Sequence, residues 1–186
     1  MVILLFLVRS IDIIIKCVND LKEEFRMNIN FVRVDDRLIH GQVATVWVKE
    51  SKCNKIIICS DDVAKDTLRK TLILQVAPPG IKAYVLPIEK ALEVYKNPKY
   101  DSFKALILCT NPVDVLKLIE GGMDIKSVNL GGMCYKEGRT QISSAVSLGP
   151  EDIQALKKMH ELGVELELRK IASDSKVDVM SKIKDL

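Results

Sequence analysis

The feature that most constrains this chain is a regular alternation of short β-rich runs with longer helical patterns from Met27 to the C-terminus. The runs that predict strands are residues 30–34, 55–59, 82–86, 105–109, 127–130 and 164–168. Helical patterns fill the gaps at residues 62–76, 111–120 and 150–162. Strands joined through helices in this way form right-handed crossovers and a mostly parallel sheet. The sequence therefore predicts a single α/β domain, an open twisted sheet with helices on both faces.

The helical patterns carry signals for their ends and their buried sides. In the 62–76 segment, one stripe is apolar, the pattern of a helix that packs on a core, and it consists of Ala64, Leu68, Leu72 and Val76. Asn111 followed by Pro112 predicts a capped helix start. Gly163 predicts a helix end.

Composition narrows the possible function classes. Hydrophobic residues make up 48% of the 186, which is enough for a buried core, and the net charge of +3 is too mild to demand nucleic acid. Aromatic residues are only 5%, which argues against a base-stacking surface. The two histidines do not have metal-ligand spacing, and Cys59 and Cys109 end apolar runs as buried free thiols do. No metal and no cofactor are expected.

Residues 1–26 form a separate segment. Its apolar run ends before Arg9, whereas a spanning helix needs about 20 mostly apolar residues. A secretory signal would have a basic start and a small-residue cleavage site, and neither is present. Lys22-Glu23-Glu24 can be encoded by a ribosome-binding sequence, which makes Met27 the expected natural start and residues 27–186 the domain. An amphipathic helix or an added edge strand is the alternative.

Ligands of open parallel sheets bind beyond the carboxyl ends of the strands. Polar residues and glycines gather in the segments that leave those ends, namely residues 35–41, 60–62, 87, 110–112 and 131–133. Asp61, Thr110, Gly131 and Gly132 are therefore candidates for contacts with an anion or a partner. Helix capping explains Asp61 and Thr110 equally well.

The richest of these segments surrounds His40, three residues after Arg37 and directly before Gly41. An unprotonated imidazole is nucleophilic, and one ring nitrogen can take a phosphoryl group while a neighbour holds the other. The guanidinium of Arg37 matches phosphate oxygens, and Gly41 leaves room for an incoming phosphate. Either Asp35 or Asp36 could orient the imidazole or the arginine. The alternative is a salt-bridged turn in which His40 only caps a helix.

The segment DDRLIHGQV, residues 35–43, resembles the phosphorylation-site signature of the enzyme IIB component of the mannose/fructose/sorbose family of sugar phosphotransferase systems. The resemblance extends in order through SDD at 60–62, RKTLILQVAPPG at 69–80, NLGGM at 129–133 and LELR at 166–169. It covers Met27 to the C-terminus and leaves residues 1–26 outside the family pattern.

The resemblance implies a phosphotransferase with a largely parallel twisted sheet. His40 falls on the histidine that accepts phosphate at Nδ1 from a phosphorylated IIA protein and passes it to sugar bound by the membrane IIC/IID components. Arg37 falls on the motif arginine near the phosphate, and Gln42 lies within the same motif. A cytoplasmic homodimer at the membrane permease is implied, with mannose, fructose, sorbose or an amino sugar as substrate and no nucleic acid.

Two other function classes match parts of the sequence. A receiver domain phosphorylated on aspartate also has paired acids after its first strand, which Asp35 and Asp36 match. It further needs an aspartate after the third strand and a lysine after the fifth, where this chain has Pro87 and Gly131. A nucleotide-binding module needs a G-x-G-x-x-G or G-x-x-x-x-G-K-[ST] loop, and neither occurs.

Overall fold

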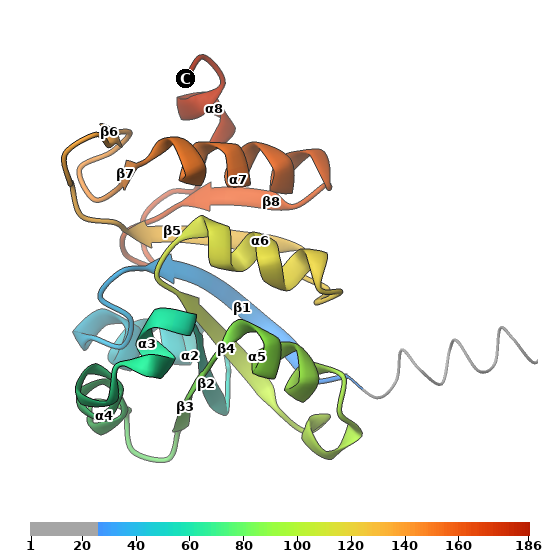
Figure 1. Ribbon diagram of the computed structural model, residues 1–186. Coiled ribbons are helices and arrows are strands. Elements are labelled where there is room, and N and C mark those ends of the chain that lie inside the picture. Colours follow the sequence, from blue (N-terminus) through green and yellow to red (C-terminus); the bar gives the residue numbers. More distant parts are fainter. Residues whose placement is uncertain (1–25) are drawn as a thin grey trace, which may run out of the picture.

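The computed structural model describes residues 26–186. The prediction about an upstream extension therefore lies, except for Arg26, outside the described residues. Within them, a seven-stranded sheet has the order β3-β2-β4-β1-β5-β8-β9, as Figure 1 shows. The strands are β1 (Asn28–Asp35), β2 (Lys55–Cys59), β3 (Lys82–Leu86), β4 (Lys104–Cys109), β5 (Ser127–Gly132), β8 (Glu165–Leu168) and β9 (Val177–Asp178). All pairs are parallel except β8 with β9.

Helices cover both faces of this sheet (Figure 1). The helical elements are η1 (Val43–Trp47), α2 (Val48–Glu50), α3 (Asp61–Lys65), α4 (Thr67–Gln75), α5 (Ile88–Tyr95), η2 (Pro98–Tyr100), α6 (Pro112–Glu120), α7 (Pro150–Glu161) and α8 (Met180–Ile183). A short antiparallel hairpin, β6 (Thr140–Gln141) and β7 (Ser147–Leu148), precedes α7. None of the helices in residues 26–186 has the length and apolar character needed to cross a membrane.

Side chains alternate between two hydrophobic clusters because successive strand residues point to opposite faces. Ile57 belongs to the cluster that includes residues of α5, α6 and α7, whereas Ile56 and Ile58 belong to the cluster that includes residues of η1 and α4. Cys59 and Cys109 are fully buried, as predicted. The predicted α/β class, the mostly parallel sheet and the two covered faces are thus confirmed.

The central position of β1 decides where the site lies. From β1 the chain runs to β2 and β3, and the helices η1 and α4 of this part pack on one face of the sheet. It then returns to β4 beside β1 and crosses to β5 on the other side of β1, and α6 of this part packs on the opposite face. Crossovers that leave in opposite directions open a crevice at the carboxyl ends of the central strands. The segment that follows β1 enters this crevice.

The predicted helix at 62–76 is wrong in two respects. It is two helices, because Asp66 has an extended backbone (φ −85°, ψ 94°) and its carboxylate caps α4 by accepting the amide hydrogen of Arg69. The expected buried stripe does not continue across this break. Leu68 and Leu72 are 71% and 55% exposed, and Ile73 is the residue of α4 that enters the core.

This arrangement predicts opposite outcomes for two leucines. Leu72→Ala removes an exposed side chain and should change the free energy of unfolding by about 0.5 kcal/mol or less. Leu118→Ala in α6 removes a side chain with no exposed surface and should cost about 2–5 kcal/mol. Urea unfolding of both variants measures the difference, and equal losses would show that α4 packs against the core through Leu72.

Candidate functional site

The loop after β1 is shaped by Leu38. Its backbone has a φ of +57°, which is rare for a bulky side chain, and its amide donates a hydrogen bond to the Asp35 carbonyl at 2.9 Å. The Leu38 side chain is fully buried, and this burial offsets the unfavourable backbone conformation. The resulting tight turn leaves Arg37 exposed on one side and brings His40 back toward the end of β1.

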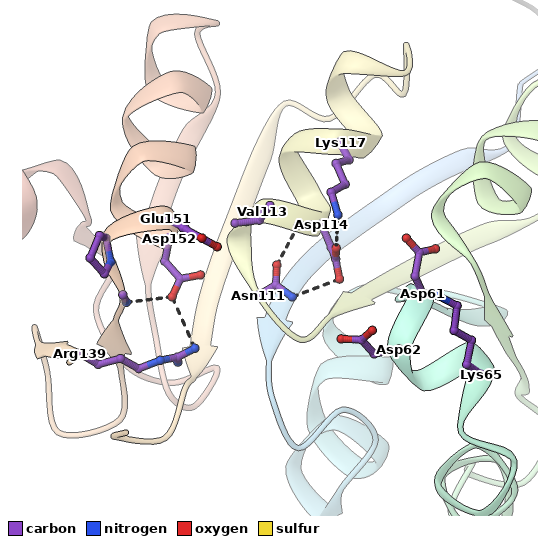
Figure 2. A pocket seen from close by; sticks show the side chains of 12 residues that line it. Asp61, Asp62, Lys65, Asn111, Val113, Asp114, Lys117, Arg139, Glu151 and Asp152 are labelled. Carbon is purple, nitrogen blue, oxygen red and sulfur yellow. Dashed lines mark hydrogen bonds and ion pairs between the residues drawn. The ribbon is translucent and has the colours of Figure 1, made fainter. Parts of the chain in front are cut away.

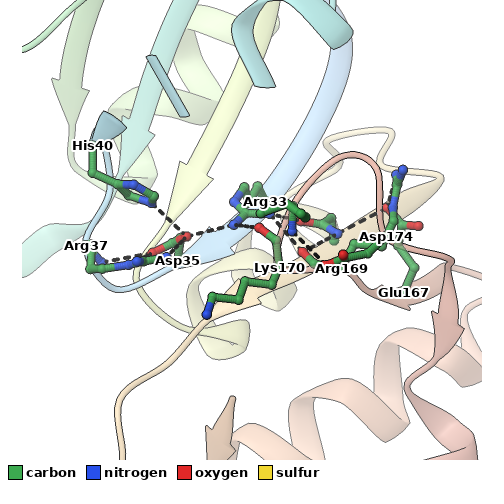
Figure 3. Close-up of polar contacts among 10 residues, drawn as sticks. Arg33, Asp35, Arg37, His40, Glu167, Arg169, Lys170 and Asp174 are labelled. Carbon is green, nitrogen blue, oxygen red and sulfur yellow. Dashed lines mark hydrogen bonds and ion pairs between the residues drawn. The ribbon is translucent and has the colours of Figure 1, made fainter. Parts of the chain in front are cut away.

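Asp35 is the centre of the site, and Figure 3 shows three basic side chains pointing toward it. His40 Nε2 lies 3.1 Å from Oδ2 of Asp35, and Arg33 donates to the same oxygen at 2.9 Å. Arg37 binds both carboxylate oxygens, with Nε 2.9 Å from Oδ1 and an NH2 group 3.0 Å from Oδ2. The sequence left open which aspartate orients the imidazole and the arginine, and in the structure Asp35 contacts both.

Asp36 has a different role. Its Oδ2 accepts a hydrogen bond from the backbone amide of Cys134 at 2.7 Å, and its own amide donates to the Gly132 carbonyl at 3.0 Å. The Asp36 carbonyl accepts a hydrogen bond from Arg69 of α4. Asp36 therefore fastens the loop to the end of β5 and to α4.

The charge state of Asp35 determines the form of the imidazole. Burial alone would raise the pKa of this carboxyl, but the hydrogen bonds from His40 and Arg37 and the charge of Arg33 outweigh it, so the pKa lies well below its usual value. Asp35 is therefore ionised at neutral pH and can only accept hydrogen bonds. In the neutral imidazole the proton then sits on Nε2, and Nδ1 keeps a free lone pair.

Arg33 was not predicted from the sequence, yet it is part of this network. Its guanidinium has no exposed surface, donates to Asp35 and Asn129, and lies 4.6 Å from the centre of the Trp47 ring. Alternate residues of a strand share a face, so an arginine two positions before an aspartate on one strand indicates that the two side chains can pair. This was the signal in the sequence for the contact between Arg33 and Asp35. An arginine between Val32 and Val34 could equally well have faced solvent.

The three glycines near the site differ in what surrounds them. A Cβ on Gly131 would lie 1.8 Å from the guanidinium carbon of Arg33, and one on Gly132 would lie 3.0 Å from Arg37. Both glycines are buried and leave the space that the two arginine side chains occupy. A Cβ on Gly41 would meet no atom within 4 Å, so open space lies beside this glycine.

Three candidates remain, namely Asp61, Thr110 and Gln42. Asp61 accepts the amide hydrogen of Ile88 at 2.9 Å, and the Thr110 hydroxyl accepts one from the Asn111 side chain at 3.0 Å. Both thus support helix starts, the alternative that the sequence left open. Gln42 lies next to the loop with a buried side-chain oxygen that has no hydrogen-bond partner.

A groove of about 650 Å³ separates α3 from α6 and the start of α7, and Figure 2 shows Asp61, Asp114 and Asp152 around it. Two of its acidic side chains, those of Asp114 and Asp152, are paired with basic residues. Asp114 bonds to Asn111 and Lys117, and Asp152 contacts Arg139. A smaller hollow, of about 280 Å³, borders Asp36 and Arg37.

Known proteins are similar to this chain in sequence and in architecture. Residues 29–185 match the model of the PTS system sorbose subfamily IIB component. The chain belongs to the sorbose subfamily of phosphotransferase-system IIB components. It is 50% identical over 160 residues to the sorbose-specific EIIB component of Lacticaseibacillus casei, a match that covers 86% of this chain and 98% of that protein.

Two further relatives show how this IIB chain compares in length and structure. It is 52% identical over 157 residues to the mannose-specific EIIAB component of Escherichia coli (strain K12), but it spans 49% of that protein's length. The match covers 84% of this chain. The crystal structure of the IIBSor domain of the sorbose permease from Klebsiella pneumoniae superposes with a TM-score of 0.83 at 49% identity. That superposition covers 86% of this chain and 98% of the other.

The charge network predicts a pH-dependent stability difference for Asp35→Asn. The substitution leaves Arg33 buried without its anion and should lower the free energy of unfolding at pH 7 by about 3–5 kcal/mol. Because the pKa of Asp35 is lower in the folded than in the unfolded chain, its contribution is present above the unfolded value of about 3.9 and is lost as pH falls through the folded value. The gap between wild type and variant should therefore narrow below about pH 4.

Urea unfolding of both proteins at pH 3 and pH 7 measures this gap. Asp62→Asn is the matched control, because Asp62 is exposed on α3 and should lose about 0.5 kcal/mol or less at either pH. A gap that does not change between the two pH values would contradict the lowered pKa of Asp35.

Proposed function

We propose that this IIB chain is a covalent phosphoryl carrier and a phosphotransferase. It accepts phosphate on Nδ1 of His40 from a phosphorylated IIA protein and transfers it to sugar bound by the membrane IIC/IID components. The observation that carries this proposal is the contact of 3.1 Å between His40 Nε2 and a buried, ionised Asp35. That contact leaves Nδ1 as the nucleophilic nitrogen.

The neighbouring groups suit phosphoryl transfer, which depends mainly on positioning and on stabilisation of charge. The Nδ1 lone pair attacks phosphorus while the bond from phosphorus to the donor histidine nitrogen breaks. Arg37 has a 44% exposed side chain and lies beside the 280 Å³ hollow, so its guanidinium can reach equatorial phosphate oxygens. Gly41 leaves open space for the phosphoryl group.

The names of the relatives support the partners that we infer for this carrier. One relative is named as a mannose-specific EIIAB component, and others as sorbose-specific and fructose-specific EIIB components. We therefore infer a IIA donor, a membrane permease and a sugar substrate (mannose, fructose, sorbose or an amino sugar). We also propose residues 27–186 as the functional domain and a cytoplasmic homodimer as the working form.

An aspartate-phosphorylated receiver fits this geometry poorly. Asp35 is fully buried between basic side chains, and Oδ2 of Asp36 is bonded to the Cys134 amide. Pro87 and Gly131 stand where a receiver needs an aspartate and a lysine. No contact of the described residues favours phosphorylation on either carboxylate.

The phosphorylation site can be tested with the chain's own second histidine as a control. With phosphoenolpyruvate, the general phosphotransferase proteins and a IIA protein, wild type should take up acid-labile, alkali-stable phosphate. His40→Ala should take up none and keep its fold, because the imidazole is only part-buried. His160→Ala removes an exposed histidine of α7 and should label like wild type. Label that persists in His40→Ala would place the phosphate elsewhere.

Arg37 should matter more for transfer than for stability. Arg37→Ala removes the guanidinium that we propose to bind the developing charge, and it should slow phosphoryl transfer about 10²–10³-fold. Because its side chain is 44% exposed, the loss of unfolding free energy should be about 1 kcal/mol or less. Arg69→Ala, which removes an exposed arginine that contacts the same loop, is the control and should transfer at nearly the wild-type rate. Comparable defects in rate and stability for Arg37→Ala would make it a structural residue.

A further inference from the structure

We propose that Arg33 is a positioning residue of this site, a buried counter-ion that keeps Asp35 ionised and oriented when Arg37 turns to the phosphoryl group. This inference rests on the proposed phosphoryl transfer and assigns a role to a residue outside the DDRLIHGQV motif. Its basis is the pair of arginines on one carboxylate, one with a fully buried side chain and the other 44% exposed.

Both terminal nitrogens of the Arg33 guanidinium are held by partners, whereas its Nε is buried without one. Besides Asp35 and the Asn129 side chain, its guanidinium binds the carbonyls of Arg169 and Lys170 at 3.1 and 3.2 Å. The Trp47 ring lies under it, with the guanidinium carbon 4.6 Å from the ring centre. Such a set of partners permits one position for the guanidinium.

Gly131 leaves the space that the Arg33 guanidinium occupies. An added Cβ there would lie 1.8 Å from the guanidinium carbon of Arg33 and 1.9 Å from one of its NH2 nitrogens. No relaxation of a methyl group accommodates contacts of that length while Arg33 stays in place. The absence of a side chain at position 131 is therefore a condition for the contact between Arg33 and Asp35.

Arg37 has the opposite character. Its Nε and one NH2 nitrogen are bonded to Asp35, and these are the donors that a guanidinium uses to hold two phosphate oxygens. Arg37 can hold phosphate with these two donors only after it releases the carboxylate. Arg33 does not face solvent, so it stays with Asp35 while the exposed arginine moves.

Without Arg33, the exposed side chain of Arg37 would be the remaining arginine on Asp35, and each release of it would leave the buried carboxylate with His40 and the Arg37 backbone amide but without a counter-ion. A buried carboxylate without a counter-ion takes up a proton. Protonated Asp35 would donate its hydrogen to Nε2 of His40, and the imidazole proton would then sit on Nδ1. The lone pair needed for attack on phosphorus would be lost from that nitrogen.

The test uses two variants. Gly131→Ala displaces Arg33 without removing any charge, and Arg33→Lys keeps the positive charge but loses the planar guanidinium with its several N–H donors. Gly149→Ala is the matched control, since its added Cβ would approach no closer than 3.5 Å to any neighbour. Long-range ¹H–¹⁵N correlation spectra of the unphosphorylated proteins report which nitrogen of His40 carries the proton. Phosphorylation by phosphoramidate, a small donor, reports the rate at Nδ1 without any partner protein.

Wild type and Gly149→Ala should hold the proton on Nε2 and be phosphorylated at Nδ1. The two site variants should show a mixed tautomer and a rate lower by about 10-fold or more, comparable to the loss when the outer partner of a functional histidine is removed. Folded variants with the wild-type tautomer and rate would overturn the proposal. If wild type takes no phosphate from phosphoramidate or from phosphorylated IIA, the carrier function fails, whereas a changed tautomer in the variants still supports Arg33 as the positioning group.

A measurement on wild type guards against variants that do not fold. Side-chain ¹⁵N signals of the arginines are recorded before and after phosphorylation by phosphoramidate. The Arg37 guanidinium signals should shift and those of Arg33 should stay. A large shift of Arg33 with an unchanged Arg37 would refute the division of roles.

Discussion

The structure around the site depends on one buried carboxylate. Asp35 has no exposed surface, and burying a charge without partners costs several kcal/mol even after relaxation. Its oxygens therefore receive donors from Arg33, Arg37 and His40. The same requirement explains the two buried glycines, because the guanidinium groups that neutralise Asp35 occupy the space where their side chains would be.

The sheet places this carboxylate where a partner protein can reach its neighbours. Because β1 lies between β4 and β5, the end of the strand is buried on both sides while the loop beyond it opens into the crevice. Asp35 is fully buried, whereas the His40 side chain at the far end of the loop is 20% exposed. The His40 side chain is thus accessible, although the carboxylate that it contacts is shielded from water and salt.

Local patterns predicted the strands and the position of His40 near the end of β1 because those signals lie within a few residues. The bounds 55–59 and 82–86 were predicted correctly, since apolar β-rich runs are bounded by polar turns. The Arg33 network was missed because its contact with Asn129 joins residues 96 positions apart. The helix break at Asp66 was missed because the apolar spacing continues through it, and only the cap geometry of this residue reveals the second start.

The two arginines on Asp35 also explain how the site can tolerate movement of the Arg37 side chain. Oδ1 of Asp35 accepts from the Arg37 side chain and, at 3.3 Å, from the Arg37 backbone amide. When the side chain leaves, Oδ1 keeps that amide, and Oδ2 keeps Arg33 and His40. Neither oxygen is then left buried without a donor, the condition that would cost about 1–3 kcal/mol. A lysine at position 33 would place a single point charge where the Arg33 guanidinium lies, and it could not bind Asp35, Asn129 and two carbonyls in one plane.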